Sequence, residues 1–391
     1  MRNRWIALGA LTAARLAMGV AFQSIAALAP DLMARSGMGW AEIGSLMGAF
    51  MLPGIAAALA GGWLGARFGE GRVAVAGLLT MAVSGAAIAA LAEFEALFAA
   101  RLVLGAGGVA LNVMLTKMVA DRFAAEDLPV AMGVFVSSWP VGLALALLAL
   151  PPAAAAFGPG AALAGVAALA LAAAGLVAAV APPRAGGPPP PRARLTRAEL
   201  AGVLLAGSVW GLYNVPLILF LGFGPALFAA RGWAEAEAGP AVSVFGWVTI
   251  VSVVLGGWVA RALGGRGRCL ALCLAGWTAA TLALAFDLPG ATTPLFLGLV
   301  AAVAGIGAGS IMAMPAVATR PESRSVGMGV FYAVYYAFMT VGPPLAGWMV
   351  DATGDPAAPF ALSAALLVAT ALAALAFERG LAPPASAVRR S

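Results

Sequence analysis

Twelve apolar stretches, each long enough to cross a lipid bilayer as a helix, constrain the fold of this chain more than any other feature. An α-helix rises about 1.5 Å per residue, so about 20 apolar residues cover the hydrocarbon core of a membrane. Because 63% of the 391 residues are hydrophobic and 10% are charged, little of the chain is left to form a domain in water. We therefore predict an all-α membrane protein. Its expected spans are 5–28, 42–64, 73–92, 97–119, 130–150, 160–181, 199–223, 239–260, 269–287, 294–316, 326–349 and 358–378.

The basic residues lie mostly on one side of these spans. If the N-terminus is cytoplasmic, seventeen arginines fall in cytoplasmic segments and only Arg35 and Arg231 lie on the opposite side. Loops rich in Lys and Arg stay in the cytoplasm, so this asymmetry and the even number of spans place both termini there. The formal charge of +6 thus reflects topology and does not indicate nucleic-acid binding. We expect a multi-pass protein of a bacterial inner membrane.

The chain has no histidine, which removes the usual general base and the commonest metal ligand. The two cysteines, Cys269 and Cys273, lie four residues apart and are interpreted as helix-packing residues. We therefore expect no enzyme activity, no cofactor and no metal site.

One long polar interruption divides the chain. Residues 182–198 read Pro-Pro-Arg-Ala-Gly-Gly followed by further prolines and arginines, a composition that neither continues a helix nor enters lipid. Six predicted spans precede this segment and six follow it. We predict an N-terminal six-helix bundle over 1–181, a cytoplasmic linker over 182–198 and a C-terminal six-helix bundle over 199–391.

The two halves repeat each other at an offset of about 195 residues. An even number of helices per copy makes both copies enter the membrane from the same side, with a cleft between them. The repeat therefore predicts alternating access to a central site. The matching segments are 61–64 with 256–259, 39–42 with 232–235 and 132–135 with 328–331.

Three segments resemble motifs of the major facilitator superfamily of secondary transporters. Residues 61–69 read Gly-Gly-Trp-Leu-Gly-Ala-Arg-Phe-Gly, residues 97–107 place Arg101 before Leu-Gly-Ala-Gly, and residues 342–354 begin with Gly-Pro-Pro-Leu-Ala-Gly-Trp. The resemblance implies two six-helix bundles around a central cleft and transport of a small molecule by alternating access. We expect a monomer in the bilayer.

Two positions depart from the family pattern. Ala66 stands where the family usually has an acidic residue, so the cytoplasmic gate implied by the resemblance lacks one charge. Residues 137–142 read Ser-Ser-Trp-Pro-Val-Gly in place of the proline-glycine pattern of the antiporter branch. This second departure argues against drug:proton antiport.

Four charged residues are candidates for coupling or gating, and the resemblance implies such a role for two of them, Arg67 and Arg101. Arg67 could pair with Asp121 at the end of the fourth span. Lys117 lies one turn before Asp121, and a pair between these two is the favoured interpretation. Arg101 lies about one turn inside its span, so its long side chain could instead reach the membrane surface as an anchor.

Arg15 is the main candidate for the transport site. It lies ten residues after Trp5, or about 15 Å into the membrane, where a charge costs about 2.5–3.5 kcal/mol. Helical spacing places Gly19 and Phe22 on the stripe of Arg15, with Gln23 beside it. We predict that this stripe faces the cleft and binds substrate. The alternative is a structural role in which Arg15 binds helix carbonyls or a neighbouring helix.

Polar and aromatic residues of other spans complete the predicted site. Asn112 shares a helix face with Arg101, and the repeat offset places Trp210 opposite Arg15. Tyrosines deep in a span need a hydrogen-bond partner, which favours a position at the cleft. The further predicted substrate residues are Tyr213, Asn214, Tyr332, Tyr335 and Tyr336.

All sixteen carboxylates fall in connections or at span ends. A cleft with an arginine and no acidic partner favours an anion, because the anion supplies the missing countercharge. We predict transport of a small, monocarboxylate-like organic anion with proton symport or exchange. One alternative is efflux of drug-like or amphipathic compounds with a structural Arg15, and another is a membrane receptor or scaffold without transport.

Overall fold

The computed structural model describes residues 2–124, 127–181 and 194–381, and every regular element within these ranges is a helix. The elements are α1 (Arg2–Ala27), α2 (Ala29–Ser36), α3 (Trp40–Met51), α4 (Gly54–Phe68), α5 (Glu70–Ala90), α6 (Phe94–Ala120), α7 (Leu128–Phe157), α8 (Pro159–Val180), α9 (Arg197–Ala230), α10 (Glu235–Ala262), α11 (Arg266–Ala285), α12 (Pro294–Ile306), α13 (Ala308–Met312), α14 (Met314–Ala318), α15 (Arg324–Thr353) and α16 (Ala358–Leu381).

Twelve helical segments of the described chain are long and apolar enough to cross a membrane, which confirms the predicted number of spans. The second span consists of α3 and α4, which are separated at Leu52–Pro53, and the tenth span consists of α12, α13 and α14. The short helix α2 was not predicted. It contains Pro30, Asp31 and Arg35 and connects the first two spans.

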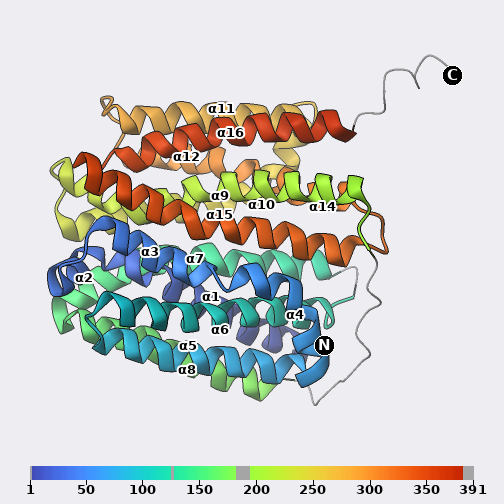
Figure 1. Cartoon of the computed structure of the whole chain (residues 1–391), viewed down its shortest axis with the longest axis horizontal. Helices are drawn as coiled ribbons and strands as arrows, with labels where there is room; N and C mark the ends of the chain where they lie inside the picture. The colour runs from blue at the N-terminus through green and yellow to red at the C-terminus, as the bar shows by residue number, and fades with distance from the viewer. Residues whose placement is uncertain (1, 125–126, 182–193, 382–391) are drawn as a thin grey trace.

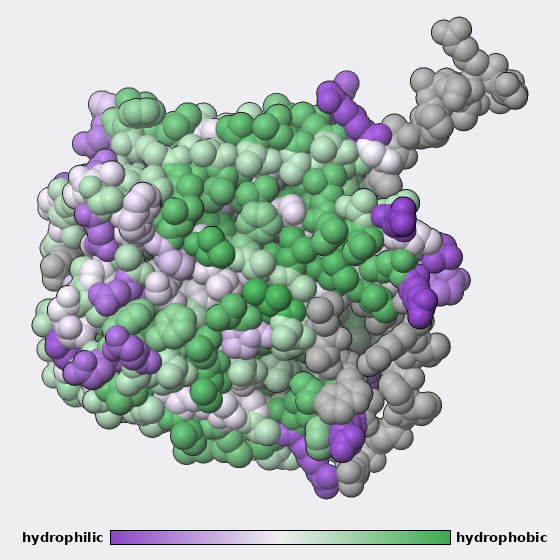
Figure 2. Space-filling view, in the orientation of Figure 1, coloured by the Kyte–Doolittle hydropathy of each residue, from purple (hydrophilic) through white to green (hydrophobic). Residues whose placement is uncertain are grey.

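The surface has the polarity expected of a protein that spans a bilayer. Figure 2 shows apolar residues over the middle of one face and polar residues at the two edges where the helices end. A wide apolar surface of this kind is stable only in contact with lipid. The protein is therefore an integral, multi-pass membrane protein, in agreement with the predicted class.

The spans form two six-helix bundles that lie side by side, with α1 to α8 in one and α9 to α16 in the other (Figure 1). We call the end of the molecule where α8 ends and α9 begins the linker end, and the opposite end the far end. The predicted linker, 182–198, connects these two helices. Its residues 182–193 are outside the described ranges, and Arg197 and Ala198 belong to α9 instead.

Two spans extend beyond their predicted ends because helices in the membrane continue through proline. α9 runs past residue 223 to Ala230, through Pro225, and α7 runs past residue 150 to Phe157. Pro225 has no N–H for the carbonyl of Leu221, four residues before it. The Gln23 side chain of α1 donates to that carbonyl at 2.9 Å. A partner from the other bundle thus satisfies the carbonyl that the proline leaves free.

The two bundles approach each other most closely where glycines on one helix face the backbone of another. A Cβ atom on Gly44 of α3 would collide with the carbonyl oxygen of Pro343 in α15, and one on Gly347 of α15 would collide with that of Trp40. Small residues at such crossings let two helix backbones come into contact. The α3–α15 crossing therefore closes the far end of the molecule between the bundles.

Candidate transport site

A cavity of about 400 Å³ lies between the two bundles. Its walls come from the middle and linker-end parts of the spans, including Asn112 and Thr116 of α6, Ser137 of α7, and Thr249 of α10. The contacts between the bundles at Gln23 and at the α3–α15 crossing lie on the far-end side of this cavity. The cavity is thus closed toward the far end.

The structure brings most of the predicted substrate residues together in this one cavity. Those that line it are Arg15, Asn112, Trp210, Tyr213, Asn214, Tyr332, Tyr335 and Tyr336. They come from two spans of the N-terminal bundle and two of the C-terminal bundle. The repeat offset, which placed Trp210 opposite Arg15, is the sequence signal that paired the two walls.

The Arg15 guanidinium is held in position by the N-terminal bundle. Its Nε donates to Asn112 Oδ1 at 2.9 Å, and its Nη1 donates to the carbonyls of Phe135 at 3.1 Å and Val136 at 2.8 Å. The Val136 carbonyl is available because Pro140, four residues later, has no N–H to offer it. The guanidinium carbon also lies 4.8 Å from the centre of the Phe135 ring. These contacts fix the direction of the positive charge.

The charge of Arg15 has no acidic partner within the described chain. None of the ion pairs among these residues includes Arg15, and the residues that line the cavity include no Asp or Glu. The three hydrogen bonds of Arg15 use Nε and Nη1, while Nη2 makes no hydrogen bond to a described residue. The cavity is therefore positively charged.

The C-terminal bundle contributes an aromatic wall. The Tyr335 ring centre lies 5.1 Å from that of Tyr336, 6.2 Å from that of Tyr332 and 6.2 Å from that of Trp210. The fourth tyrosine, Tyr213, is buried and donates its hydroxyl hydrogen to the carbonyl of Ala304. Three tyrosines thus remain close to Arg15 across the cavity, where aromatic faces can contact an apolar part of a ligand.

Three predicted substrate residues lie away from the cavity. Gly19 packs against the backbone of α7, where an added Cβ would lie 2.8 Å from the carbonyl oxygen of Trp139. The Phe22 ring packs against Phe50, at 5.2 Å between centres, and Gln23 is buried in its bond to α9. The Arg15 stripe continues toward the far end, where α1 contacts its neighbours. Helical spacing alone does not show where along a span a cleft closes.

Arg101 is buried inside the N-terminal bundle, so the surface-anchor interpretation is wrong. Its side chain is 0% exposed and donates to the carbonyls of Leu46 at 3.1 Å, Ala21 at 2.8 Å and Phe22 at 3.1 Å. It thereby connects α6 to α1 and α3. Helix depth suggested that Arg101 could reach the surface, but the side chain points inward, where these three carbonyls replace water.

Two of the predicted gate residues, Lys117 and Asp121, form a cluster with Glu70 at the linker end of the N-terminal bundle. Lys117 Nζ donates to Asp121 at 2.9 Å, as the favoured interpretation has it, and also to Glu70. Arg67 is exposed, and its guanidinium carbon lies 5.5 Å from the centre of the Phe68 ring. Sequence reasoning missed Glu70, which lies at the start of α5. It is 47 residues from Lys117 in the sequence, so only the fold brings the two side chains together.

Asp351 forms a contact at the far end that sequence reasoning also missed. Its carboxylate, near the end of α15, accepts hydrogen bonds from the backbone N–H groups of Trp40 at 2.9 Å and Ala41 at 2.7 Å. These groups belong to the first turn of α3, where N–H groups lack helical partners and favour a negative charge. Asp351 thus joins the two bundles beside the glycine crossing.

An ion pair between Glu199 and Arg320 lies at the linker end of the C-terminal bundle. Glu199, at the start of α9, accepts from Arg320 Nε at 2.9 Å and from the Ser323 hydroxyl at 2.6 Å. The hydrogen bond and the charge of Glu199 raise the pKa of the Arg320 guanidinium above its ordinary value. The pair connects the start of α9 to the segment before α15, within one bundle.

Comparison with solved structures shows the fold of known transporters. A bacterial homologue of the human lysosomal transporter Spinster, in an inward-facing and occupied conformation, matches with a TM-score of 0.73 and 16% identity over 97% of this chain and 98% of that chain. The nucleoside transporter NupG, as a single-residue variant, matches with a TM-score of 0.74 and 13% identity over 95% and 99%. No curated protein sequence matches.

A sequence model described as the Major Facilitator Superfamily matches residues 11–230 and 200–390. These two matches cover nearly the whole chain and include every residue that lines the central cavity. Together with the twelve spans and the two bundles, they establish that this chain belongs to the Major Facilitator Superfamily and is a secondary transporter.

Proposed function

We propose that the protein transports a small organic anion, such as a monocarboxylate with an apolar body, with proton symport or exchange as the coupling. The observation that carries this proposal is the position of Arg15. Its guanidinium lies in the wall of the central cavity without an acidic partner among the described residues. A bound anion would supply the countercharge that the protein itself does not.

The geometry of the cavity supports an anion with two different ends. A carboxylate could accept hydrogen bonds from Nη2 of Arg15, because charge-assisted bonds of this type are short and strong. The rings of Tyr332, Tyr335 and Trp210 face the apolar end of the same ligand across the cavity. A strongly polar or doubly charged anion fits this wall less well.

The absence of an acidic residue from the cavity lining limits how protons can be coupled. A buried carboxylate is the usual proton carrier of such transporters, and the described lining has none. In this proposal the substrate itself, or its charge balance with Arg15, takes the place of a protein carboxylate in proton coupling, or the substrate exchanges for a second anion. Neither route needs a titrating side chain in the cavity.

The orientation in the membrane is part of the same proposal. The asymmetry of arginines supports a cytoplasmic position of the linker end, and we propose a bacterial inner membrane as the location. The far end, closed by Asp351 and the α3–α15 crossing, would then face the periplasm. This structure would accordingly be the state that binds or releases substrate on the cytoplasmic side.

Efflux of drug-like or amphipathic compounds is the second candidate, and one observation favours it. Arg15 already has three acceptors in the protein, from Asn112, Phe135 and Val136, as the structural alternative for this residue requires. An Arg15 that serves only α1–α7 packing would leave an aromatic cavity suited to apolar compounds.

Uptake and counterflow in proteoliposomes separate these two candidates. We expect labelled monocarboxylates to accumulate and to be exchanged, with a rate that responds to an imposed pH gradient if protons are carried. Labelled organic cations and neutral amphipathic compounds should not be transported. Transport of the cations or amphipathic compounds, with no flux of any anion tested, would contradict the proposal and support drug efflux.

A further inference from the structure

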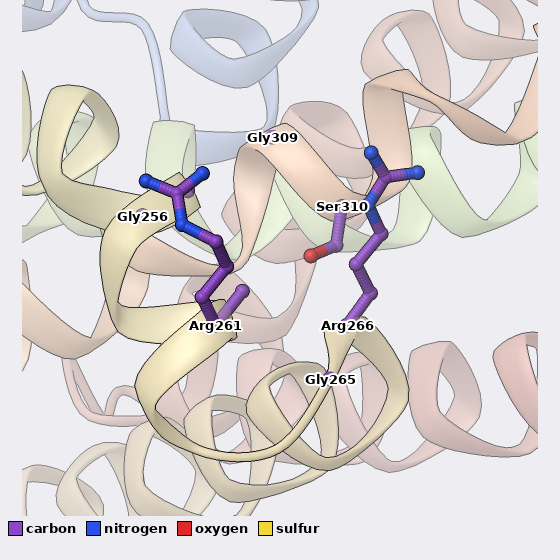
Figure 3. Close-up of a pocket in the computed structure, with 8 residues that line it drawn as sticks. Gly256, Arg261, Gly265, Arg266, Gly309 and Ser310 are labelled. Atoms are coloured by element: carbon purple, nitrogen blue, oxygen red, sulfur yellow. The ribbon is translucent and has the colours of Figure 1, made fainter.

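A second cavity lies at the linker end of the C-terminal bundle, and its lining shares only Gly309 with that of the transport site. It has a volume of about 350 Å³ and is bordered by α10, the turn after it, the start of α11, and α13. Figure 3 shows the side chains of Arg261 and Arg266 extending to the same side of it, with Ser310 between them. None of these three residues has a role in the proposed transport cycle.

The two arginines are free to bind an external anion. Arg261 and Arg266 are both exposed, and among the hydrogen bonds and ion pairs of the described residues none involves either guanidinium. The residues that line the cavity include no Asp or Glu. The carboxylate of Glu378, in α16, lies beside Gly267 of α11 and outside the lining. Two like charges at one cavity are stabilised by an anion between them.

Glycines create both the turn and the space. Gly264 and Gly265 have φ angles of 82° and 132°, which favour glycine, and this turn brings the end of α10 next to the start of α11. At Gly257 and Gly309, an added Cβ would have no atom within 4 Å. Any larger residue at these two positions would project into open space, so the cavity depends on their lacking side chains.

The start of α11 adds backbone donors. α11 begins at Arg266, beside Gly265 in the cavity wall, and Gly265 has no side chain to cap the helix. The first N–H groups of a helix carry partial positive charge and bind phosphate groups well. The Ser310 hydroxyl, which makes no hydrogen bond to a described residue, supplies a further donor at the same cavity.

The cavity lies at the depth of lipid headgroups. α10 ends at Ala262 and α11 begins at Arg266, so the cavity is at the ends of two spans. Trp258, next to Gly257 in α10, is 65% exposed, and tryptophan is the residue type that concentrates at the membrane interface. Basic pockets between spans at this depth suit the headgroups of anionic lipids.

We propose that this cavity is a binding site for a phosphate group, held by Arg261, Arg266 and the first turn of α11. An anionic phospholipid headgroup and a soluble phosphate compound share this chemistry. The position at the ends of the spans favours the headgroup.

Native mass spectrometry and thermal unfolding of the purified full-length protein test this site. The probes are short-chain phosphatidylglycerol, phosphatidylcholine and inorganic phosphate. We expect phosphatidylglycerol to remain bound and to raise the unfolding temperature by a few degrees, while phosphatidylcholine, which has no net charge, does so much less. A comparable effect of inorganic phosphate would identify soluble phosphate as a sufficient ligand, and no effect of it would identify the lipid as the source.

Two variants and a matched control test whether the ligand binds in this cavity. Arg261→Gln combined with Arg266→Gln should abolish the phosphatidylglycerol effect. Arg324→Gln combined with Arg379→Gln removes two exposed arginines of the same bundle that do not line the cavity and should preserve it. Gly257→Leu keeps both charges but fills the cavity, and should also abolish binding. Equal responses of the cavity variants and the control to every probe would overturn the proposal.

Discussion

Two arginines lie inside the N-terminal bundle, and their acceptors distinguish their roles. Arg101 is fully buried and uses three of its nitrogens on carbonyls of α1 and α3. Arg15 uses two nitrogens on α6 and α7 and lines the central cavity. The first arrangement holds helices together, whereas the second also leaves part of a positive charge for a ligand.

Replacement of Arg15 should therefore affect transport far more than stability. We expect Arg15→Ala to lower the uptake of an organic anion by about tenfold or more, the loss of one charge-assisted interaction. Arg15→Lys should recover only part of the rate, because lysine cannot form the planar fork that binds a carboxylate. Initial rates in proteoliposomes measure both effects.

Arg379→Ala, which removes an exposed arginine at the end of α16, is the matched control and should transport normally. If Arg15→Ala transported the anion at the control rate with unchanged KM, Arg15 would have no part in binding. The structural role that its three acceptors allow would then be its whole function.

Replacement of Arg101 should lower the stability of the protein more than replacement of Arg15 does. Arg101→Ala removes three hydrogen bonds from a charged donor and leaves a buried space, so we expect the protein to lose about 1–3 kcal/mol of stability. Thermal unfolding in detergent checks this, with Arg15→Ala as the comparison. An unfolding temperature equal to that of the unmodified protein would show that Arg101 does not hold α1, α3 and α6 together.

At the scale of elements, prolines explain where sequence prediction of the spans was incomplete. The predicted span 199–223 stops before Pro225, whereas α9 continues through it to Ala230. In the structure the carbonyls that Pro225 and Pro140 leave free have partners, Gln23 for one and Arg15 for the other. These partners lie more than 100 residues away in the sequence, and a local pattern cannot reveal them.

The contact between α3 and α15 should set the balance between the two conformations of the transporter. Asp351 accepts from two N–H groups at the start of α3, and alternating access requires this contact to break when the far end opens. We expect Asp351→Ala to shift the population toward the far-end-open state by about tenfold, since such bonds contribute about 1.5 kcal/mol or more. Hydrogen exchange at Trp40 and Ala41 should become faster.

Asp355→Ala provides the comparison for this experiment, because Asp355 accepts a similar backbone bond, from Ala357 at 2.8 Å, within its own loop. This variant should leave exchange in α3 unchanged. Unchanged exchange in α3 of Asp351→Ala as well would mean that the glycine crossing alone holds the far end closed.

At the scale of the whole molecule, composition, span length and the internal repeat were enough to predict the fold. The length of an apolar span is set by the thickness of the bilayer, and the repeat is visible as matching segments at a nearly constant offset, so both can be read from the sequence alone. The location of the cavity along the spans depends on which end is closed. Arg15 and Tyr335 were predicted to line the cavity and do so. Gly19 and Gln23 were predicted to line it as well, but they lie closer to the closed far end and pack between helices.

The orientation and the open side can be tested together by labelling single cysteines. Thr116 and Ser137 line the cavity toward the linker end. With Cys269 and Cys273, both buried, replaced by Ala, we expect Thr116→Cys and Ser137→Cys to react with a membrane-impermeant thiol reagent in inside-out vesicles. Right-side-out vesicles should react slowly, because the far end is closed. A transported anion should protect both positions, whereas faster labelling from the periplasmic side would contradict the proposed topology or the open side.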